Sequence, residues 1–188
     1  MPDVEPVILV HGGAGTISDF AKAERVIAGV KEAAKKGYQV LRSGGSVVDA
    51  VQAAVELMED NEVFNAGRGS YLTLDGEVEM DASFMVGSDL SAGAVTVVKD
   101  IKNPIALARL VMEKTGHVLL AGEGAKRFAV DQGVKPLEPG ALVTPATLEA
   151  LAKWKLKHGG APSEMGTVGA VWIYSKGRLA AATSTGGR

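Results

Sequence analysis

The residue best placed to act as a nucleophile is Thr167. It opens an apolar run directly after a segment rich in glycine, proline and serine, residues 158–166. A threonine hydroxyl reacts poorly unless a base removes its proton. The nearest base is the residue's own α-amine, which is released when the Gly166–Thr167 peptide bond is cut and which has a pKa of about 7.7–8.0. Threonine is also common in ordinary strands, so the pattern alone leaves a purely structural interpretation open.

A second threonine is predicted to lie opposite the first. Residues 175–177 (Ser-Lys-Gly) suit a three-residue hairpin loop, because their glycine falls where the backbone needs a positive φ. This loop pairs Tyr174 with Arg178, and counting outward then places Thr167 opposite Thr185. The Thr185 hydroxyl can then hydrogen-bond the Thr167 hydroxyl. The alternative is an ordinary cross-strand pair, worth about 0.2–1 kcal/mol.

The glycine-rich loop His11–Gly15 follows an apolar strand and precedes a helix, which invites a nucleotide-binding interpretation. The spacing argues against it, because a GxGxxG motif would need glycine at Ser18, and no GxxxxGK[ST] motif occurs. A nucleotide- or metal-binding module built on this loop remains as the alternative function. The other interpretations are a tight turn that lets two backbones approach closely, or a mobile loop beside a reactive centre.

Three acidic residues, Glu77, Glu79 and Asp81, alternate along one predicted strand face. They suit either a divalent cation or, more commonly, a solvated strand face. The three histidines do not stand at metal-ligand spacing, and no GxSxG motif supports a serine hydrolase. The absence of cysteine excludes disulfides, thiolate metal sites and a thiol nucleophile.

The remaining sequence predicts one mixed α/β domain. The chain has 188 residues and a net charge of −2, which argues against a nucleic-acid partner. No apolar run reaches the ~20 residues of a membrane span, and the acidic, proline-containing start is unlike a signal peptide, so we expect a cytoplasmic protein. Periodicity predicts strands over 7–10, 77–86, 92–98, 118–120, 167–174 and 179–185, and helices over 19–42, 46–60, 104–114, 122–132 and 144–157.

Seven short motifs, taken in order, resemble those of the plant-type L-asparaginase/isoaspartyl peptidase family of N-terminal-nucleophile hydrolases. Each motif is weak alone, but together they cover nearly the whole chain. They begin at Val10 (VHGGAG), Phe64 (FNAGRGS), Glu77 (EVEMDA), Leu90 (LSAGAV), Asn103 (NPIALARLVME), Gly166 (GTVGAV) and Ala182 (ATSTGG).

The resemblance implies an αββα sandwich in which residues 1–188 form a single domain. Residues 1–166 would be the α-subunit region, with its linker at about 158–166, and residues 167–188 the start of the β-subunit region. The precursor would cut itself between Gly166 and Thr167, beside a movable loop at Gly12 and Gly13. Thr167 would then hydrolyse L-asparagine to aspartate and ammonia, and would also cleave β-aspartyl dipeptides.

The resemblance also implies roles around the nucleophile. Asn65 would donate to the oxyanion, Thr185 would support the nucleophile, and both would contact substrate together with Gly186. Catalysis would need no cofactor. A structural sodium ion would be held by the main-chain carbonyls of Met58, Glu59, Asn61, Phe64, Ala66 and Arg68.

The chain departs from the family pattern just after Thr185. Family members continue beyond this point and supply an arginine and an aspartate that hold the substrate, together with a Thr-Gly pair for the oxyanion hole. We therefore expect this chain alone to be an inactive or truncated form, or a non-catalytic folding unit. The remaining β-subunit segment would complete it, and two αβ units would form a homodimer.

Overall fold

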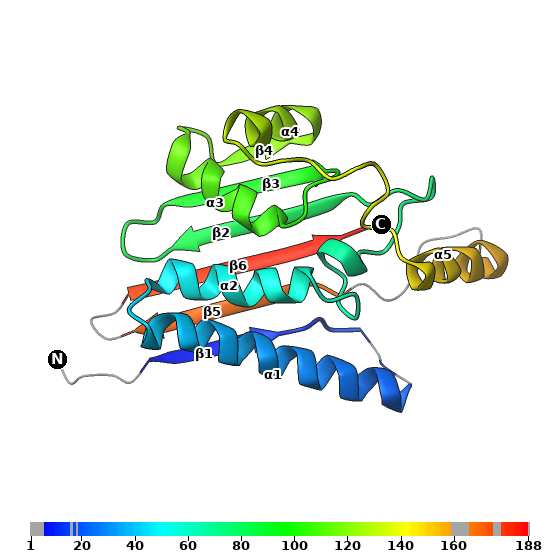
Figure 1. Cartoon of the computed structure of the whole chain (residues 1–188), viewed down its shortest axis with the longest axis horizontal. Helices are drawn as coiled ribbons and strands as arrows, with labels where there is room; N and C mark the ends of the chain where they lie inside the picture. The colour runs from blue at the N-terminus through cyan, green and yellow to red at the C-terminus, as the bar shows by residue number, and fades with distance from the viewer. Residues whose placement is uncertain (1–5, 16, 18, 159–165, 175–177, 188) are drawn as a thin grey trace.

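The computed structural model describes residues 6–15, 17, 19–158, 166–174 and 178–187, which form a mixed α/β fold around one six-stranded sheet. The strand order is β1-β5-β6-β2-β3-β4, and only the β3–β4 pair is parallel. The two strands from the carboxyl-terminal end therefore lie in the middle of the sheet (Figure 1). The strands are β1 (Val7–His11), β2 (Met80–Val86), β3 (Ala92–Val98), β4 (Leu119–Ala121), β5 (Val168–Tyr174) and β6 (Arg178–Gly186).

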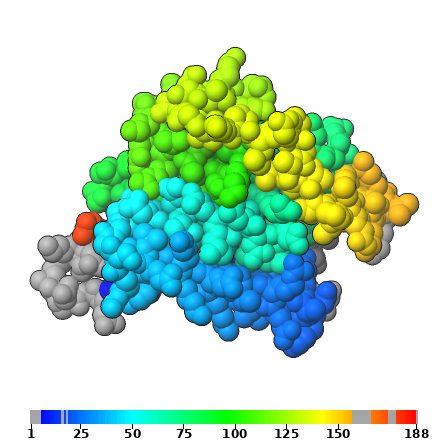
Figure 2. Space-filling model, in the orientation of Figure 1, coloured from blue at the N-terminus to red at the C-terminus, as the bar shows by residue number. Residues whose placement is uncertain are grey.

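The helices confirm the five predicted from periodicity, to within one or two residues at their ends. Helices α1, α2, α3 and α4 pack on one face of the sheet, and α5 lies at one end (Figure 1). Seen from this side, the helices hide most of the sheet (Figure 2). The helices are α1 (Phe20–Arg42), α2 (Val47–Glu59), α3 (Pro104–Lys114), α4 (Gly122–Asp131) and α5 (Pro145–His158), with a 3₁₀ turn, η1 (Gly67–Gly69). Among the described residues, no helix combines the length and apolar character needed to cross a membrane.

The starts of α2 and α3 follow from local sequence in different ways. Ser46 and Asp49 form a capping box, with the Asp49 amide donating to Ser46 Oγ at 3.1 Å and the Ser46 amide donating to the Asp49 carboxylate at 2.9 Å. Asn103 does stand at the N-cap of α3, but its side chain makes no capping bond. A carboxylate oxygen of Glu59 accepts from the Ile105 amide at 3.0 Å instead.

The acidic segment differs from its prediction, because β2 begins at Met80 rather than at residue 77. The preceding residues pair with loops: the Glu79 carbonyl accepts from the Gly187 amide at 2.9 Å. Lys99 forms ion pairs with Glu77 and Glu79. Lys99 therefore offsets one of these two negative charges, and the described residues contain no group of three or more metal-binding side chains.

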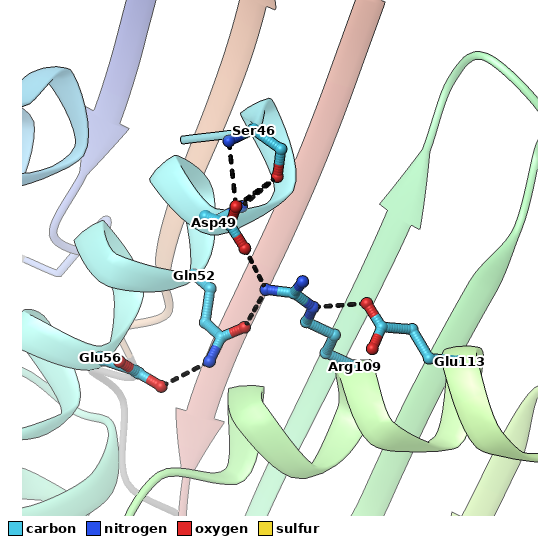
Figure 3. A network of polar contacts seen from close by, with 6 residues as sticks. All are labelled: Ser46, Asp49, Gln52, Glu56, Arg109 and Glu113. Atoms are coloured by element: carbon cyan, nitrogen blue, oxygen red, sulfur yellow. Dashed lines mark hydrogen bonds and ion pairs between the residues drawn. The ribbon is translucent and has the colours of Figure 1, made fainter. Parts of the chain in front are cut away.

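Arg109 on α3 joins α3 to α2 (Figure 3). One guanidinium nitrogen donates to Asp49 and to Gln52, each at 2.8 Å, and another donates to Glu113 at 2.6 Å. Burial alone would raise the pKa of the Asp49 carboxyl, but the hydrogen bonds from Ser46 and Arg109 outweigh it and lower that pKa. This clamp fixes the helical layer that covers β6 and β2.

The two faces of the sheet are in different environments. On the helical side, Trp172 and Phe84 are fully buried. On the other side, Leu9 is 71% exposed, and Val171 and Ile173 are 42% and 45% exposed. The described residues therefore form one sheet with helices on one face, and the second sheet and second helical layer of the expected sandwich are not among them.

Candidate active site

The β5–β6 hairpin has the predicted register. Tyr174 pairs with Arg178 and Val168 with Ser184, although the loop 175–177 lies outside the described residues. Just before β5, the Thr167 hydroxyl lies 3.2 Å from the Thr185 hydroxyl. The three-residue loop length inferred from the sequence for residues 175–177 therefore gives the register in which Thr167 and Thr185 meet.

The carbonyl oxygen of Gly166 receives two hydrogen bonds from side chains. Asn65 Nδ2 donates to it at 2.8 Å and Thr185 Oγ1 donates at 3.1 Å. The orientation of the Asn65 amide follows from its other end, because Asn65 Oδ1 accepts from the Tyr71 amide at 2.8 Å. Two aimed donors polarise the carbonyl that precedes the Thr167 hydroxyl in the chain.

The loop at Gly12 and Gly13 packs against this peptide rather than forming a free cradle. A Cβ added to Gly13, whose φ is +119°, would stand 3.1 Å from the Gly166 Cα and 3.6 Å from the Thr167 nitrogen. A Cβ at Gly12 would collide with the Phe64 ring at 2.6 Å. The glycines therefore serve close backbone approach, and no observation supports the nucleotide-binding alternative. Of the predicted linker, residues 159–165 lie outside the described residues.

Thr167 and Thr185 line two open pockets on the uncovered face, of about 410 and 210 Å³. Both include Asp81, whose carboxylate accepts from Thr96 Oγ1 at 2.5 Å and from the Val97 amide at 2.9 Å. Val97 has a positive φ of 53°, beside an irregular register between β2 and β3. A β-branched residue rarely adopts this conformation, so the backbone is strained where it holds Asp81 at the pocket.

Gly186 faces the helical side, away from these pockets. A Cβ there would stand 2.0 Å from Ser70 Oγ, while the next residue, Gly187, lines the larger pocket. The end of β6 is thus packed tightly against the segment that follows η1. The predicted contact of Gly186 with substrate could come only from its backbone.

A buried carboxyl lies behind the threonine pair. Ser184, adjacent to Thr185 but pointing to the opposite face, donates to Glu59 Oε1 at 2.7 Å. Glu59 is fully buried, and its second oxygen has no hydrogen-bond partner among the described residues. Burial raises the pKa of Glu59 to about 8, although the hydrogen bonds from Ser184 and Ile105 act to lower it. Glu59 is therefore mostly protonated at neutral pH.

The loop expected to hold sodium folds back so that carbonyl oxygens face its own glycines. The Glu59 carbonyl oxygen lies 2.2 Å from where a Cβ of Gly67 would stand, and the Phe64 carbonyl oxygen lies 2.0 Å from a Cβ of Gly69. These contacts are close backbone packing within the loop, where the carbonyls of Met58, Asn61 and Ala66 accept main-chain hydrogen bonds, and sodium binding here stays a prediction. The six residues named for this site are Met58, Glu59, Asn61, Phe64, Ala66 and Arg68.

Comparison with known proteins decides the family. A family model described as Asparaginase matches residues 4–188. The chain belongs to the asparaginase family. It is 50% identical to an isoaspartyl peptidase/L-asparaginase of Rattus norvegicus and 52% identical to one of Homo sapiens, in each case over 98% of this chain. It is also 52% identical, over 79% of its length, to a plant-type L-asparaginase of Pyrococcus horikoshii, 46% of which is covered.

This asparaginase-family chain spans about three-fifths of the length of the curated relatives it matches, 57% of the rat protein and 61% of the human protein. Sequence reasoning missed three residues that the fold places around the site: Tyr71, whose amide orients Asn65, Asp81 as a pocket residue, and Glu59 as a side-chain partner of Ser184. The sequence did contain a signal for the burial of Glu59. This residue lies four positions after Val55 and eight after Val51, which places it on the apolar face of α2.

Proposed function

We propose that the polypeptide carrying this chain is a self-processing amidohydrolase with Thr167 as its nucleophile. Its substrates are L-asparagine and β-aspartyl peptides, as the names of its relatives suggest. The observation that carries the proposal is the Gly166 carbonyl, which accepts from Asn65 and Thr185 while the Thr167 hydroxyl is hydrogen-bonded to Thr185.

Self-cleavage begins when Thr167 Oγ attacks the carbonyl carbon of Gly166. The Asn65 amide and the Thr185 hydroxyl stabilise the negative charge that develops on the carbonyl oxygen. The C–N bond breaks, the hydroxyl proton passes to the Thr167 nitrogen, and an ester joins Gly166 to Thr167 Oγ. Water then hydrolyses the ester, which leaves a carboxylate on Gly166 and restores the Thr167 hydroxyl beside a free α-amine.

The free α-amine of Thr167 then acts as the base for substrate. It takes the hydroxyl proton as Oγ attacks the side-chain amide carbon of asparagine, and it returns that proton to the leaving ammonia. Water attacks the resulting acyl-enzyme, and aspartate leaves. The two donors that hold the Gly166 carbonyl before cleavage are placed to serve the substrate's oxyanion afterwards.

The uncovered face supports a further part of this proposal, the four-layer αββα sandwich. An antiparallel sheet packed on one side only normally shows polar residues on its other side, yet Leu9, Val171 and Ile173 are apolar and exposed. We propose that a further carboxyl-terminal part of the full-length polypeptide adds a second sheet here and completes one domain. Sodium in the loop at residues 58–68 would hold the segment that packs on β6.

We also propose that two such units form a homodimer. Light scattering, which measures the mass of the particle in solution, tests this proposal.

The test is the substitution Thr167→Ala in the natural full-length polypeptide. The unsubstituted protein should give two bands on a denaturing gel, one of them comprising residues 1–166, and it should release ammonia from asparagine. Thr167→Ala should give one band and no ammonia. Thr183→Val is the control, because Thr183 is on the same strand and face as Thr185 but bonds Ser83 at 2.8 Å and not Thr167. It should process normally.

Two results contradict the proposal. One is a Thr167→Ala protein that still splits between residues 166 and 167, located by intact-mass spectrometry. The other is a Thr167→Ala protein that keeps hydrolysing asparagine at the rate of the unsubstituted enzyme.

A further inference from the structure

A small cavity of about 80 Å³ adjoins Gly166, and neither Thr167 nor Thr185 lines it. We propose that this cavity receives the carboxylate that self-cleavage creates on Gly166, with the Lys22 ammonium as its cationic partner. The inference rests on the proposed function and deepens it, because it assigns a binding site to the other product of the same cut. The residues that define the site are Gly12, Gly13, Lys22, Asn65, Tyr71 and Gly166.

Lys22 is the one charged side chain among the described residues that line the cavity. It forms no ion pair or hydrogen bond within the part of the chain that the structure describes. Two acids line the adjoining pocket, which Lys22 also lines, and each has a partner of its own. Asp19 accepts from the Ala21 amide at 2.9 Å, and Glu62 pairs with Arg25 at 3.4 Å. As far as the described residues go, the Lys22 ammonium is therefore available to an anion.

The position of Lys22 on its helix also favours an anionic ligand. It stands in the first turn of α1, which contains no acidic residue. The positive end of the helix dipole lies here, and it disfavours a cation by about 0.3–1 kcal/mol. The Asp19 carboxylate at the N-cap accepts from the Ala21 amide, and an anion in the adjoining cavity would offset the remaining repulsion on Lys22.

The cut creates an anion on Gly166, which lines the same cavity as Lys22. Before cleavage, the Gly166 carbonyl occupies the Asn65 and Thr185 donors. If the new carboxylate stayed on these donors, it would compete with the substrate's amide group for them. Asn65 and Thr185 offer the carboxylate only neutral donors, whereas Lys22 adds a full positive charge, so an ion pair with Lys22 competes with these donors for the carboxylate. Gly12, Gly13 and Gly166 have no side chains to obstruct the rotation.

The experiment uses zero-length crosslinking of the processed, natural full-length polypeptide. A water-soluble carbodiimide joins an ammonium to a carboxylate it touches by forming an amide, with the lost water taken up as the urea of the reagent. Tandem mass spectrometry should find a peptide containing Lys22 joined to the peptide that ends at Gly166. The same linkage should be present in Lys35→Met, an exposed position on the same helix. It should be absent from uncut Thr167→Ala, which has no carboxylate at Gly166.

Kinetics give a second readout. Lys22→Met keeps the aliphatic stem but leaves the carboxylate near the nucleophile, where it acts as an internal competitor. The KM for asparagine should rise about two- to fivefold, the effect expected of one partly exposed ion pair, with kcat unchanged. Lys22→Arg should restore the KM, and Lys35→Met should not alter it.

The outcomes separate the two proposals. If the unsubstituted polypeptide does not cut itself, both fail. If it cuts itself but shows no linkage between Lys22 and Gly166, or if Lys22→Met leaves the KM unchanged, this inference fails and the proposed function stands.

Discussion

Gly67 tests whether the loop at residues 58–69 is built on close backbone approach. A Cβ at Gly67 would stand 2.2 Å from the Glu59 carbonyl oxygen and 2.8 Å from the Glu59 carbonyl carbon. Real Cβ contacts are essentially never closer than 3.0 Å, so Gly67→Ala must push the backbone of η1 from the end of α2 by close to an ångström. Both atoms that collide belong to the main chain of a fully buried residue, which cannot move aside as a flexible side chain would.

Positive φ alone would also destabilise this variant, so it needs a control with the same strain. Gly67 has a φ of +55°, and Gly122 has a φ of +47°, but a Cβ at Gly122 meets nothing closer than 3.9 Å. Gly122→Ala should therefore cost about 1–2 kcal/mol, the left-handed strain alone. Gly67→Ala adds the collision to this strain and should therefore cost about 4 kcal/mol or more, which is a large loss of stability for a single substitution.

Urea unfolding of the natural full-length polypeptide measures both free energies, if both variants unfold with the slope of the unsubstituted protein. For a chain of this size, Tm should fall by about 2–4 °C per kcal/mol, so Gly67→Ala should melt well below Gly122→Ala. Equal stabilities for the two variants, within about 1 kcal/mol, would refute the argument that this loop depends on the close approach.

Two further predictions concern titrating groups. Burial raises the pKa of Glu59 in the folded state to about 8 from its ordinary value of 4.5. The folded protein therefore binds this proton more tightly, and stability falls as pH rises from about 4.5 to 8. Glu59→Gln does not titrate, so it should escape this loss, which is at most about 5 kcal/mol at 1.36 kcal/mol per pH unit; parallel stability–pH curves from urea unfolding would contradict it. Arg109→Met removes the clamp on Asp49 and should cost about 1–2 kcal/mol at pH 7. Because the pKa of Asp49 is lowered, its contribution is present above about pH 4 and lost as pH falls through the folded pKa, so the difference between Arg109→Met and the unsubstituted protein should shrink below pH 4.

Local signals in the sequence were enough to predict the helices and the hairpin. The Ser46–Asp49 capping box and Pro104 each mark a helix start with residues three or fewer apart. Gly177 set the register that brings Thr167 to Thr185, although these residues are 18 positions apart. The prediction succeeded because a side-chain period of two leaves only one face for each residue once the loop length is chosen.

The interactions that were missed join segments far apart in the sequence. Ser184 and Glu59 are 125 positions apart, and no local pattern could pair them. Asn103 has the residue type of a helix cap, but it binds Asp60 at 3.2 Å while Glu59 takes the Ile105 amide. The tertiary arrangement provided a buried carboxyl at the helix start, and this replaced the local cap.

The division of the uncovered face into a polar and an apolar half links the fold to the site. At one end, hydroxyl and carboxylate groups form a row across four strands, with Thr167 beside Thr185, Thr183 beside Ser83, and Asp81 beside Thr96. At the other end, strands β1, β5, β2 and β6 present apolar side chains, Leu9 beside Val171 and Met85 beside Ala181.

Burial of the apolar half favours a covering layer by about 25 cal/mol per Å² of apolar surface removed from water. The polar half disfavours the same cover, because buried hydroxyl and carboxylate groups lose their water without a matching set of partners. A layer held by the apolar half would therefore stand over the polar half without filling it. Thr167 lies in that polar half, so the cover that stabilises the fold would also wall a pocket around the nucleophile.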